Sequence, residues 1–212
     1  MTIFDLLFII VVLASVAALT AVVASALRGR LRQAVKLLAM YGVCLAFYLG
    51  VIVVVSLASP QCILALGESC CFDDWCVAVE DVTLARELGQ GERIARANGV
   101  FCVITLRLSN RARGRAQRAS SAAVHLVDGQ GRTYDISPQG QAAFEAQRGP
   151  TAPLTSTLPV GQSLSTVQVF DLPDDAHAVG LTVEHPVGPS PELFIIGDDA
   201  SLFHKPTIVR LP

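Results

Sequence analysis

The chain has 212 residues, of which 52% are hydrophobic and 16% charged, with a formal net charge of −2. This composition is too apolar for an ordinary soluble domain. From residue 59 onward, 17 acidic residues face 12 basic ones, and this acidic balance argues against nucleic acid as a general partner. The same stretch holds roughly 150 residues, enough for one domain with its own core.

Two apolar segments at the start of the chain predict a transmembrane hairpin. Residues 3–27 contain one charge, Asp5, and residues 37–58 contain none. Each segment exceeds the roughly 20 residues that a helix needs to cross a hydrocarbon core. The short loop between them, 28–36, carries four basic residues and no acidic one, so the positive-inside rule places it in the cytoplasm. We therefore expect residues 1–58 to be an integral membrane anchor, with both chain ends and the following domain extracytoplasmic.

The first apolar segment has the features of a retained helix and lacks those of a cleaved signal. Asp5 stands where a signal peptide has basic residues, and no small-residue cleavage site precedes a polar start. In the second segment Gly42, Ala46 and Gly50 recur at four-residue spacing. Such rows of small residues favour close packing of the two helices on each other, and a homo-oligomer interface is the alternative.

Five of the six cysteines lie beyond the second apolar segment, where an oxidising compartment favours disulfides. We expect residues 59–74 to form a cysteine-rich neck without regular strands. The favoured local pairings join Cys62 to Cys70 or Cys71, and the other of those two to Cys76. The spacing lacks the separated C-x-x-C pairs of zinc sites and the single C-x-x-C of thioredoxin-like redox sites. We therefore expect no metal and no redox centre here.

From residue 75 to residue 212, alternating apolar and polar residues predict an all-β domain, an immunoglobulin-like β-sandwich of about eight strands. The expected strands are 75–84, 100–109, 121–127, 132–136, 164–170, 178–184, 192–196 and 207–211. Residues 86–99 are expected to form a loop, and residues 138–147 a short helix or coiled loop. On strand 100–109, Cys102 points into the core and is the candidate for the unpaired cysteine.

Two polar segments are candidate contact surfaces. The first follows strand 100–109 and carries five arginines without an acid: Arg107, Arg111, Arg113, Arg115 and Arg118. It is either a solvated loop or a contact for anionic lipid headgroups, phosphate or an acidic partner. The second is a turn near the end of the chain: Asp198, Asp199, Ser201, His204 and Lys205. A capped turn or a polar contact surface accounts for this second group.

Catalytic chemistry has no support in the sequence. The four histidines are scattered without metal-ligand spacing, and the acidic pairs stand near turns, where short acidic side chains cap backbone amides. Neither a nucleophile elbow nor a calcium-binding loop occurs. We therefore expect no catalytic residue, no metal and no cofactor.

A structural pattern links strand 100–110, the hairpin after it, and residues 158–183, which read LPVGQSLSTVQVFDLPDDAHAVGLTV. It resembles the telokin-like, immunoglobulin-type domain of unknown function found on bacterial lipoproteins and membrane-anchored surface proteins. In that family a turn like Val160-Gly161 opens a strand that ends in a corner like Phe170-Asp-Leu-Pro173. The resemblance covers residues 70–211 and implies an interaction module without catalytic residues. This chain departs from the lipoproteins because it carries a helix hairpin in place of a lipidated cysteine.

Two functions remain open. The first is a non-catalytic interaction module, an accessory or scaffolding component of a bacterial envelope assembly with lipid and an unidentified protein as partners. The alternative is an extracytoplasmic sensor or ligand-binding protein for a small molecule or an envelope polymer. That alternative requires a concave apolar pocket with convergent polar groups.

Overall fold

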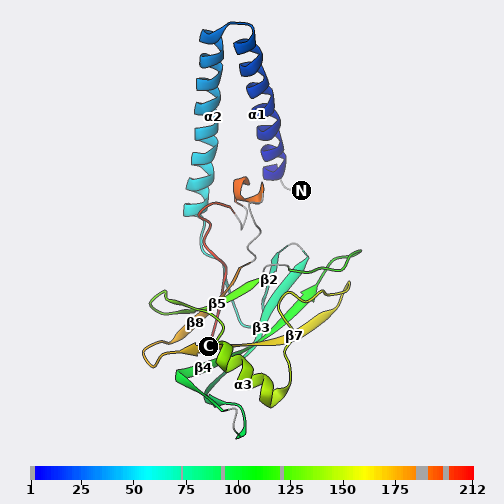
Figure 1. Cartoon of the computed structure of the whole chain (residues 1–212), viewed down its shortest axis with the longest axis vertical. Coiled ribbons are helices and arrows are strands. Elements are labelled where there is room, and N and C mark those ends of the chain that lie inside the picture. Colours follow the sequence, from blue (N-terminus) through cyan, green and yellow to red (C-terminus); the bar gives the residue numbers. More distant parts are fainter. Residues whose placement is uncertain (1–2, 73, 92–93, 120–121, 185–190, 198–200) are drawn as a thin grey trace. The chain divides into compact units, whose positions relative to one another are not determined.

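Two compact units make up the chain in the computed structural model, which describes residues 3–72, 74–91, 94–119, 122–184, 191–197 and 201–212. The first unit comprises Met1–Pro60 and Val187–Lys205, and the second comprises Gln61–Pro186 and Pro206–Pro212. The segment 187–205, expected to belong to the sandwich, therefore belongs to the unit that contains the helices. Figure 1 shows the elements of both units.

The first unit is built on an antiparallel pair of helices, α1 (Ile3–Leu27) and α2 (Leu31–Ala58), drawn in blue and cyan in Figure 1. Both are long and apolar enough to cross a membrane. The turn between them is shorter than expected, because α2 begins at Leu31 rather than at residue 37. Leu, Arg, Gln, Ala and Lys are all good helix formers, so the basic segment joins the helix. At the other end, Ser59 adopts an extended conformation before Pro60, as a residue before proline prefers.

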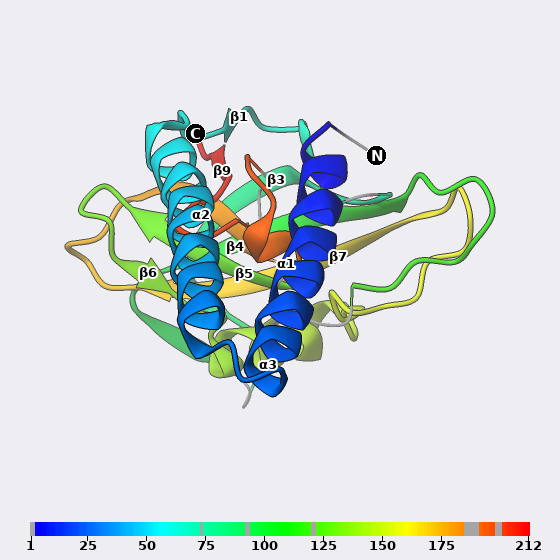
Figure 2. The ribbon, with the colours of Figure 1, turned by 90° about the horizontal axis from the view of Figure 1, so that it is seen from above.

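The second unit is a sandwich of two sheets (Figure 1, Figure 2). One sheet has the order β1-β9-β8-β5-β6, and the other has the order β2-β3-β4-β7. The first sheet consists of β1 (Ile63–Leu64), β9 (Ile208–Arg210), β8 (Ala178–Glu184), β5 (Ala123–Asp128) and β6 (Thr133–Tyr134). The second consists of β2 (Ser69–Phe72), β3 (Trp75–Leu88), β4 (Ala95–Asn110) and β7 (Ser163–Leu172). Within the described residues β1 and β9 pair in parallel, and the other ladders are antiparallel. The β-sandwich prediction is therefore confirmed.

The strict all-β prediction is wrong, because the helix α3 (Pro138–Arg148) packs on β7, β4 and β3. Ser137 caps it by accepting a hydrogen bond from the Gly140 amide at 3.1 Å, and Pro138 stands at the first helical turn, where proline is well tolerated. α3 covers part of the outer face of the second sheet, and its Ala143 is buried with Phe101 and Val103. The sandwich therefore has a second, smaller core.

The main core lies between the sheets and follows the alternation of β4. Its largest members are fully buried and include Ile104, Leu106, Phe170 and Leu126. Cys102 points into this core, as expected, and is a buried free thiol. Burial disfavours the charged thiolate and raises the pKa of Cys102 to about 11.

The connection expected at residues 86–99 is shorter than predicted, since β3 runs to Leu88 and β4 begins at Ala95, and these two residues pair. Both residues are buried in the small core with Ala143 of α3. A helix distant in the sequence thus provides the apolar surface that these strand ends need. Charged residues on the opposite side conceal the pattern in the sequence.

The neck, residues 59–74, is also more regular than expected. It contains β1, which pairs with β9 near the end of the chain, and β2, which pairs with β3. Strands this short leave no recognisable period in the sequence. From Gln61 onward the neck is part of the sandwich unit.

Residues 192–196 do not form the expected strand. The segment Pro191–Phe194 is a 3-10 helix, and it belongs to the unit of α1 and α2. A short apolar run has no periodicity that separates a strand from a helical turn, so its packing partner determines the conformation.

Candidate functional site

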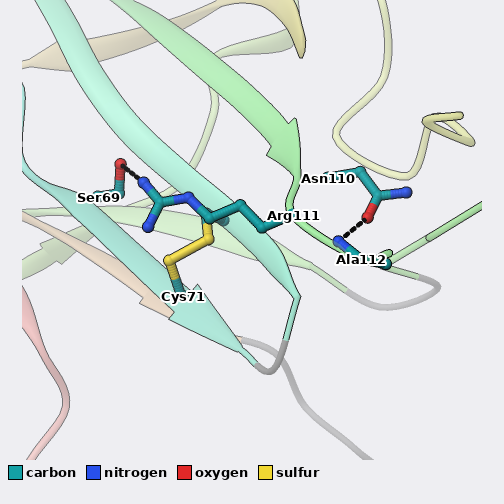
Figure 3. Close-up of a disulfide and its surroundings, with 6 residues drawn as sticks. Ser69, Cys71, Asn110, Arg111 and Ala112 are labelled. Atoms are coloured by element: carbon teal, nitrogen blue, oxygen red, sulfur yellow. Dashed lines mark hydrogen bonds between the residues drawn. A yellow bond between two sulfur atoms is a disulfide. The ribbon is translucent and has the colours of Figure 1, made fainter. Parts of the chain in front are cut away.

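The candidate site is the arginine loop, defined as residues 111–118, which follows β4. Asn110 fixes its root and is only 2% exposed. The Asn110 side-chain amide donates to the carbonyls of Arg115 at 3.0 Å and Leu158 at 2.9 Å. Its Oδ1 accepts from the Ala112 amide at 2.8 Å, as Figure 3 shows. One buried side chain therefore holds the loop to the turn before β7 and sets the path of its backbone.

A disulfide-linked hairpin supports the same end of β4. Cys71 on β2 and Cys76 on β3 are joined, and the ladder places these two residues directly opposite each other. The Arg111 amide donates to the Asp74 carbonyl at 2.7 Å in the turn between the strands. The Arg111 guanidinium reaches the Ser69 hydroxyl at 3.2 Å (Figure 3). The arginine loop is thus tied to a covalently closed hairpin.

This pairing decides between the disulfide alternatives. Cys76 bonds to Cys71 and not to Cys70, because strand register sets the two bonded residues face to face. The expected bridge from Cys62 does not form, and Cys62 is an exposed free thiol. The reason is topological, since Cys62 directly precedes β1, which belongs to the other sheet.

The structure separates the five candidate arginines into two groups. Arg107 lies on β4 and pairs with Glu80 at 3.3 Å, so its charge is compensated. The other four arginines share the loop and are exposed: Arg111, Arg113, Arg115 and Arg118. Arg118 donates to the Thr155 carbonyl at 3.1 Å. Among the described residues, no ion pair involves any of these four guanidinium groups. The loop therefore concentrates four exposed arginines.

The second candidate surface is different from the expected one. Ser201 is 5% exposed, and its hydroxyl shares a hydrogen bond of 2.9 Å with the Ser56 hydroxyl on α2. It is therefore an internal contact of the first unit and not part of an exposed surface. Lys205 reaches the Ser59 carbonyl at 3.2 Å, and His204 is half-buried. Asp198 and Asp199 lie outside the described residues.

Sequence reasoning missed a charged network at the β5–β6 hairpin. Asp128 is 3% exposed and accepts from Arg132 Nε at 2.6 Å, from the Tyr134 hydroxyl at 3.0 Å and from two backbone amides. Burial alone would raise the pKa of Asp128, but the hydrogen bonds from Arg132, Tyr134 and Gln130 outweigh it and lower the pKa to about 2. Arg132 also pairs with Asp175 at 2.9 Å. The network links the β5–β6 hairpin to the turn after β7. The sequence signal for this hairpin was the Asp128-Gly129 turn.

Sequence reasoning also missed Asn110, although an asparagine at a strand end is a recognisable signal for hydrogen bonds to the local backbone.

The described residues were also compared with the requirements of metal and ligand sites. No group of three or more histidine, cysteine or acidic side chains is placed to hold a metal within the part of the chain that the structure describes. An open depression of about 360 Å³ lies beside α3 and is lined by Ile94, Ala95, Gln139, Ala142 and Ala143. Among these described residues, Gln139 is the polar one.

A family of domains of unknown function, DUF4352, matches residues 64–191, more than half of the chain. The chain belongs to this family. The DUF4352 match runs from β1 to the start of the 3-10 helix and so includes the arginine loop and the disulfide. No curated protein matches the chain in sequence. The telokin-like immunoglobulin resemblance stays a prediction.

Three solved structures have a similar fold. A conserved hypothetical protein from Bacillus anthracis is 18% identical and has a TM-score of 0.45, with 57% of this chain and 88% of that chain covered. An uncharacterised β-sandwich protein from Clostridium difficile is 11% identical, with a TM-score of 0.44 and coverages of 73% and 96%. A secreted protein from Mycobacterium tuberculosis is 16% identical, with a TM-score of 0.42 and coverages of 60% and 92%.

Proposed function

We propose that this DUF4352 protein is a membrane-anchored, non-catalytic interaction module whose arginine loop binds an acidic surface of an envelope protein. In this proposal α1 and α2 cross the membrane, their basic turn lies in the cytoplasm and the sandwich lies outside. The apolar length of both helices and the four basic residues at their connection support this placement. The telokin-like resemblance agrees with an interaction module.

The observation that carries the proposal is the cluster of exposed arginines on the fixed backbone of the arginine loop. Arg113 and Arg115 are exposed, while Asn110 and Arg111 hold the loop backbone to the turn before β7 and to the disulfide hairpin. A preorganised loop loses less conformational entropy on binding than a flexible one. Arginine suits this use because its planar guanidinium binds carboxylates through two parallel hydrogen bonds.

Charge contrast also supports a protein partner. The chain beyond residue 59 is net acidic, so the arginine loop is a local positive site on a negative background. Charges at an interface rim mainly raise the association rate and fix the orientation of the partners. We therefore expect association to weaken as salt concentration rises, because salt screens exposed charges. Among its described lining residues, the depression beside α3 has one polar side chain, Gln139, whereas a ligand-binding site brings several polar groups together.

The experiment is affinity purification of the tagged full-length protein from its native membranes in mild detergent. The test variant is Arg113→Glu/Arg115→Glu, and the matched control is Arg86→Glu/Arg210→Glu, which makes the same charge change at two exposed arginines elsewhere in the sandwich. We expect wild type and control to retain a stoichiometric partner that the test variant loses. A test variant that retains this partner would refute the role of the loop, and wild type recovered alone would refute the interaction module.

A further inference from the structure

The chain segment between β8 and β9 returns to helix α2 and contacts it at three polar positions. The Tyr48 hydroxyl donates to the Phe194 carbonyl at 2.6 Å, Ser201 bonds Ser56, and Lys205 reaches the Ser59 carbonyl. From Tyr48 to Ser59, at 1.5 Å per residue, α2 rises about 16 Å. The segment therefore follows the last three turns of the helix rather than touching only its end.

The level of these contacts on α2 indicates their depth in a bilayer. A hydrocarbon core of about 30 Å is crossed by roughly 20 helical residues. With Lys36 at the inner edge, the outer edge falls near Ser56. Tyr48 then lies about 12 Å inside that edge. The Phe194 carbonyl, bonded to Tyr48, is thus at the depth of the outer-leaflet acyl chains.

The side chains of the segment match this depth. Leu193 to Ile196 form an uninterrupted apolar run. Phe194 is 42% exposed and Phe203 is 67% exposed, so aromatic rings are presented outward. Lys205 bonds at the level of Ser59, where its ammonium reaches the polar interface. The apolar run Leu193–Ile196 thus lies deep and Lys205 lies shallow, as in membrane-interfacial segments.

Three polar groups of the segment have the partners that a lipid environment requires. Irregular backbone is tolerated at membrane depth only where its polar groups have partners. The Phe194 carbonyl accepts from Tyr48, the Leu193 carbonyl accepts from the Leu202 amide at 3.2 Å, and the buried hydroxyl of Ser201 pairs with that of Ser56. This arrangement also explains why Tyr48 and Ser56 occur in the otherwise apolar C-terminal half of α2.

We propose that residues 191–197 and 201–205 form a re-entrant membrane element that packs on α2, with Phe194 among the acyl chains of the outer leaflet and Phe203 at the polar interface. This inference rests on the proposed crossing of the membrane by α1 and α2.

The test is quenching of tryptophan fluorescence by lipids brominated on their acyl chains, with the full-length protein in phosphatidylcholine vesicles. Trp75 is the single native tryptophan and is 3% exposed, so wild type supplies the baseline. Phe194→Trp and Phe203→Trp are the test variants. Phe47→Trp, 75% exposed on α2, is the positive control, and Val160→Trp, 46% exposed in the sandwich unit, is the negative control.

We expect Phe194→Trp to lose as much emission as Phe47→Trp, Phe203→Trp to lose less because it lies at the outer edge of the hydrocarbon core, and Val160→Trp to stay at the wild-type level. Quenching of Phe47→Trp without quenching at residue 194 would overturn the re-entrant element and leave the membrane anchor standing. An unquenched Phe47→Trp would overturn the anchor and this inference together. Equal quenching at Val160 would show that lipid contact is not particular to the element, and would also overturn the inference.

Discussion

Asn110→Ala should destabilise the sandwich and loosen the arginine loop. Asn110 is buried and makes three hydrogen bonds to backbone groups, those of Ala112, Arg115 and Leu158. An alanine at this position removes all three hydrogen bonds, and the three backbone groups lose the Asn110 side chain as a partner. The consequences differ among the three, because their surroundings differ.

The magnitude follows from which groups remain without a partner. The Leu158 carbonyl keeps a second bond from the Gln117 amide at 3.0 Å, and Arg115 is exposed, so water can replace its lost bond. The amide of Ala112, a residue that is 5% exposed, has no such replacement. A buried unsatisfied polar group costs about 1–3 kcal/mol. We therefore expect a loss of about 2 kcal/mol in the free energy of unfolding.

The assay is urea unfolding of the full-length protein in detergent micelles, followed by the fluorescence of Trp75. Trp75 is directly opposite Asn110 in the β3–β4 ladder, so it reports on the relevant end of the sandwich. Asn98→Ala is the matched control, since the Asn98 side chain bonds Asp171 at an exposed site. We expect a loss below about 1 kcal/mol for the control, because water replaces an exposed bond.

Trypsin provides an independent readout, because it cleaves after the arginines of the loop. Cleavage after Arg113 and Arg115 should be faster in Asn110→Ala than in wild type, and unchanged in Asn98→Ala. If Asn110→Ala is no less stable than Asn98→Ala and is cleaved at the wild-type rate, then Asn110 does not hold the loop.

Three further predictions test other parts of the structure. A Cβ on Gly99 would lie 2.6 Å from a backbone carbon of the β7–β8 turn, so Gly99→Ala should lower the free energy of unfolding in urea by about 1–3 kcal/mol. As a control, a Cβ on Gly114 meets open space, so Gly114→Ala should leave the urea midpoint unchanged. A membrane-impermeant maleimide should label Cys62, an exposed thiol, in intact cells. Cys102 should react only after unfolding, because it is buried and its pKa is raised to about 11. Labelling of Cys62 only after permeabilisation would reverse the proposed topology. The folded-state pKa of Asp128, about 2, is below its ordinary value of 3.8, so its contribution to stability should be present above pH 3.8 and lost as pH falls toward 2. The urea midpoint of Asp128→Asn should therefore change less over this pH range than that of wild type, and equal changes would contradict the network.

The two helices and the central strand of the sandwich could be predicted because local periodicity encodes them. Residues 3–27 match α1, and the expected strand 178–184 matches β8 residue for residue. The alternation of residues 100–109 placed Cys102 in the core, where the structure has it. In each case hydrophobic pattern alone selects the conformation. The arginine loop was likewise visible, because its four arginines without an acid stand out in composition.

Tertiary structure alone decided the features that depend on distant partners. Strand register, not spacing, joined Cys71 to Cys76, and the packing of α3 turned the expected loop 86–99 into paired strand ends. Ser201 lies 145 positions from Ser56 yet bonds to it in a buried site. Local sequence cannot specify such a contact, because its free energy depends on surfaces that meet only when the chain is folded.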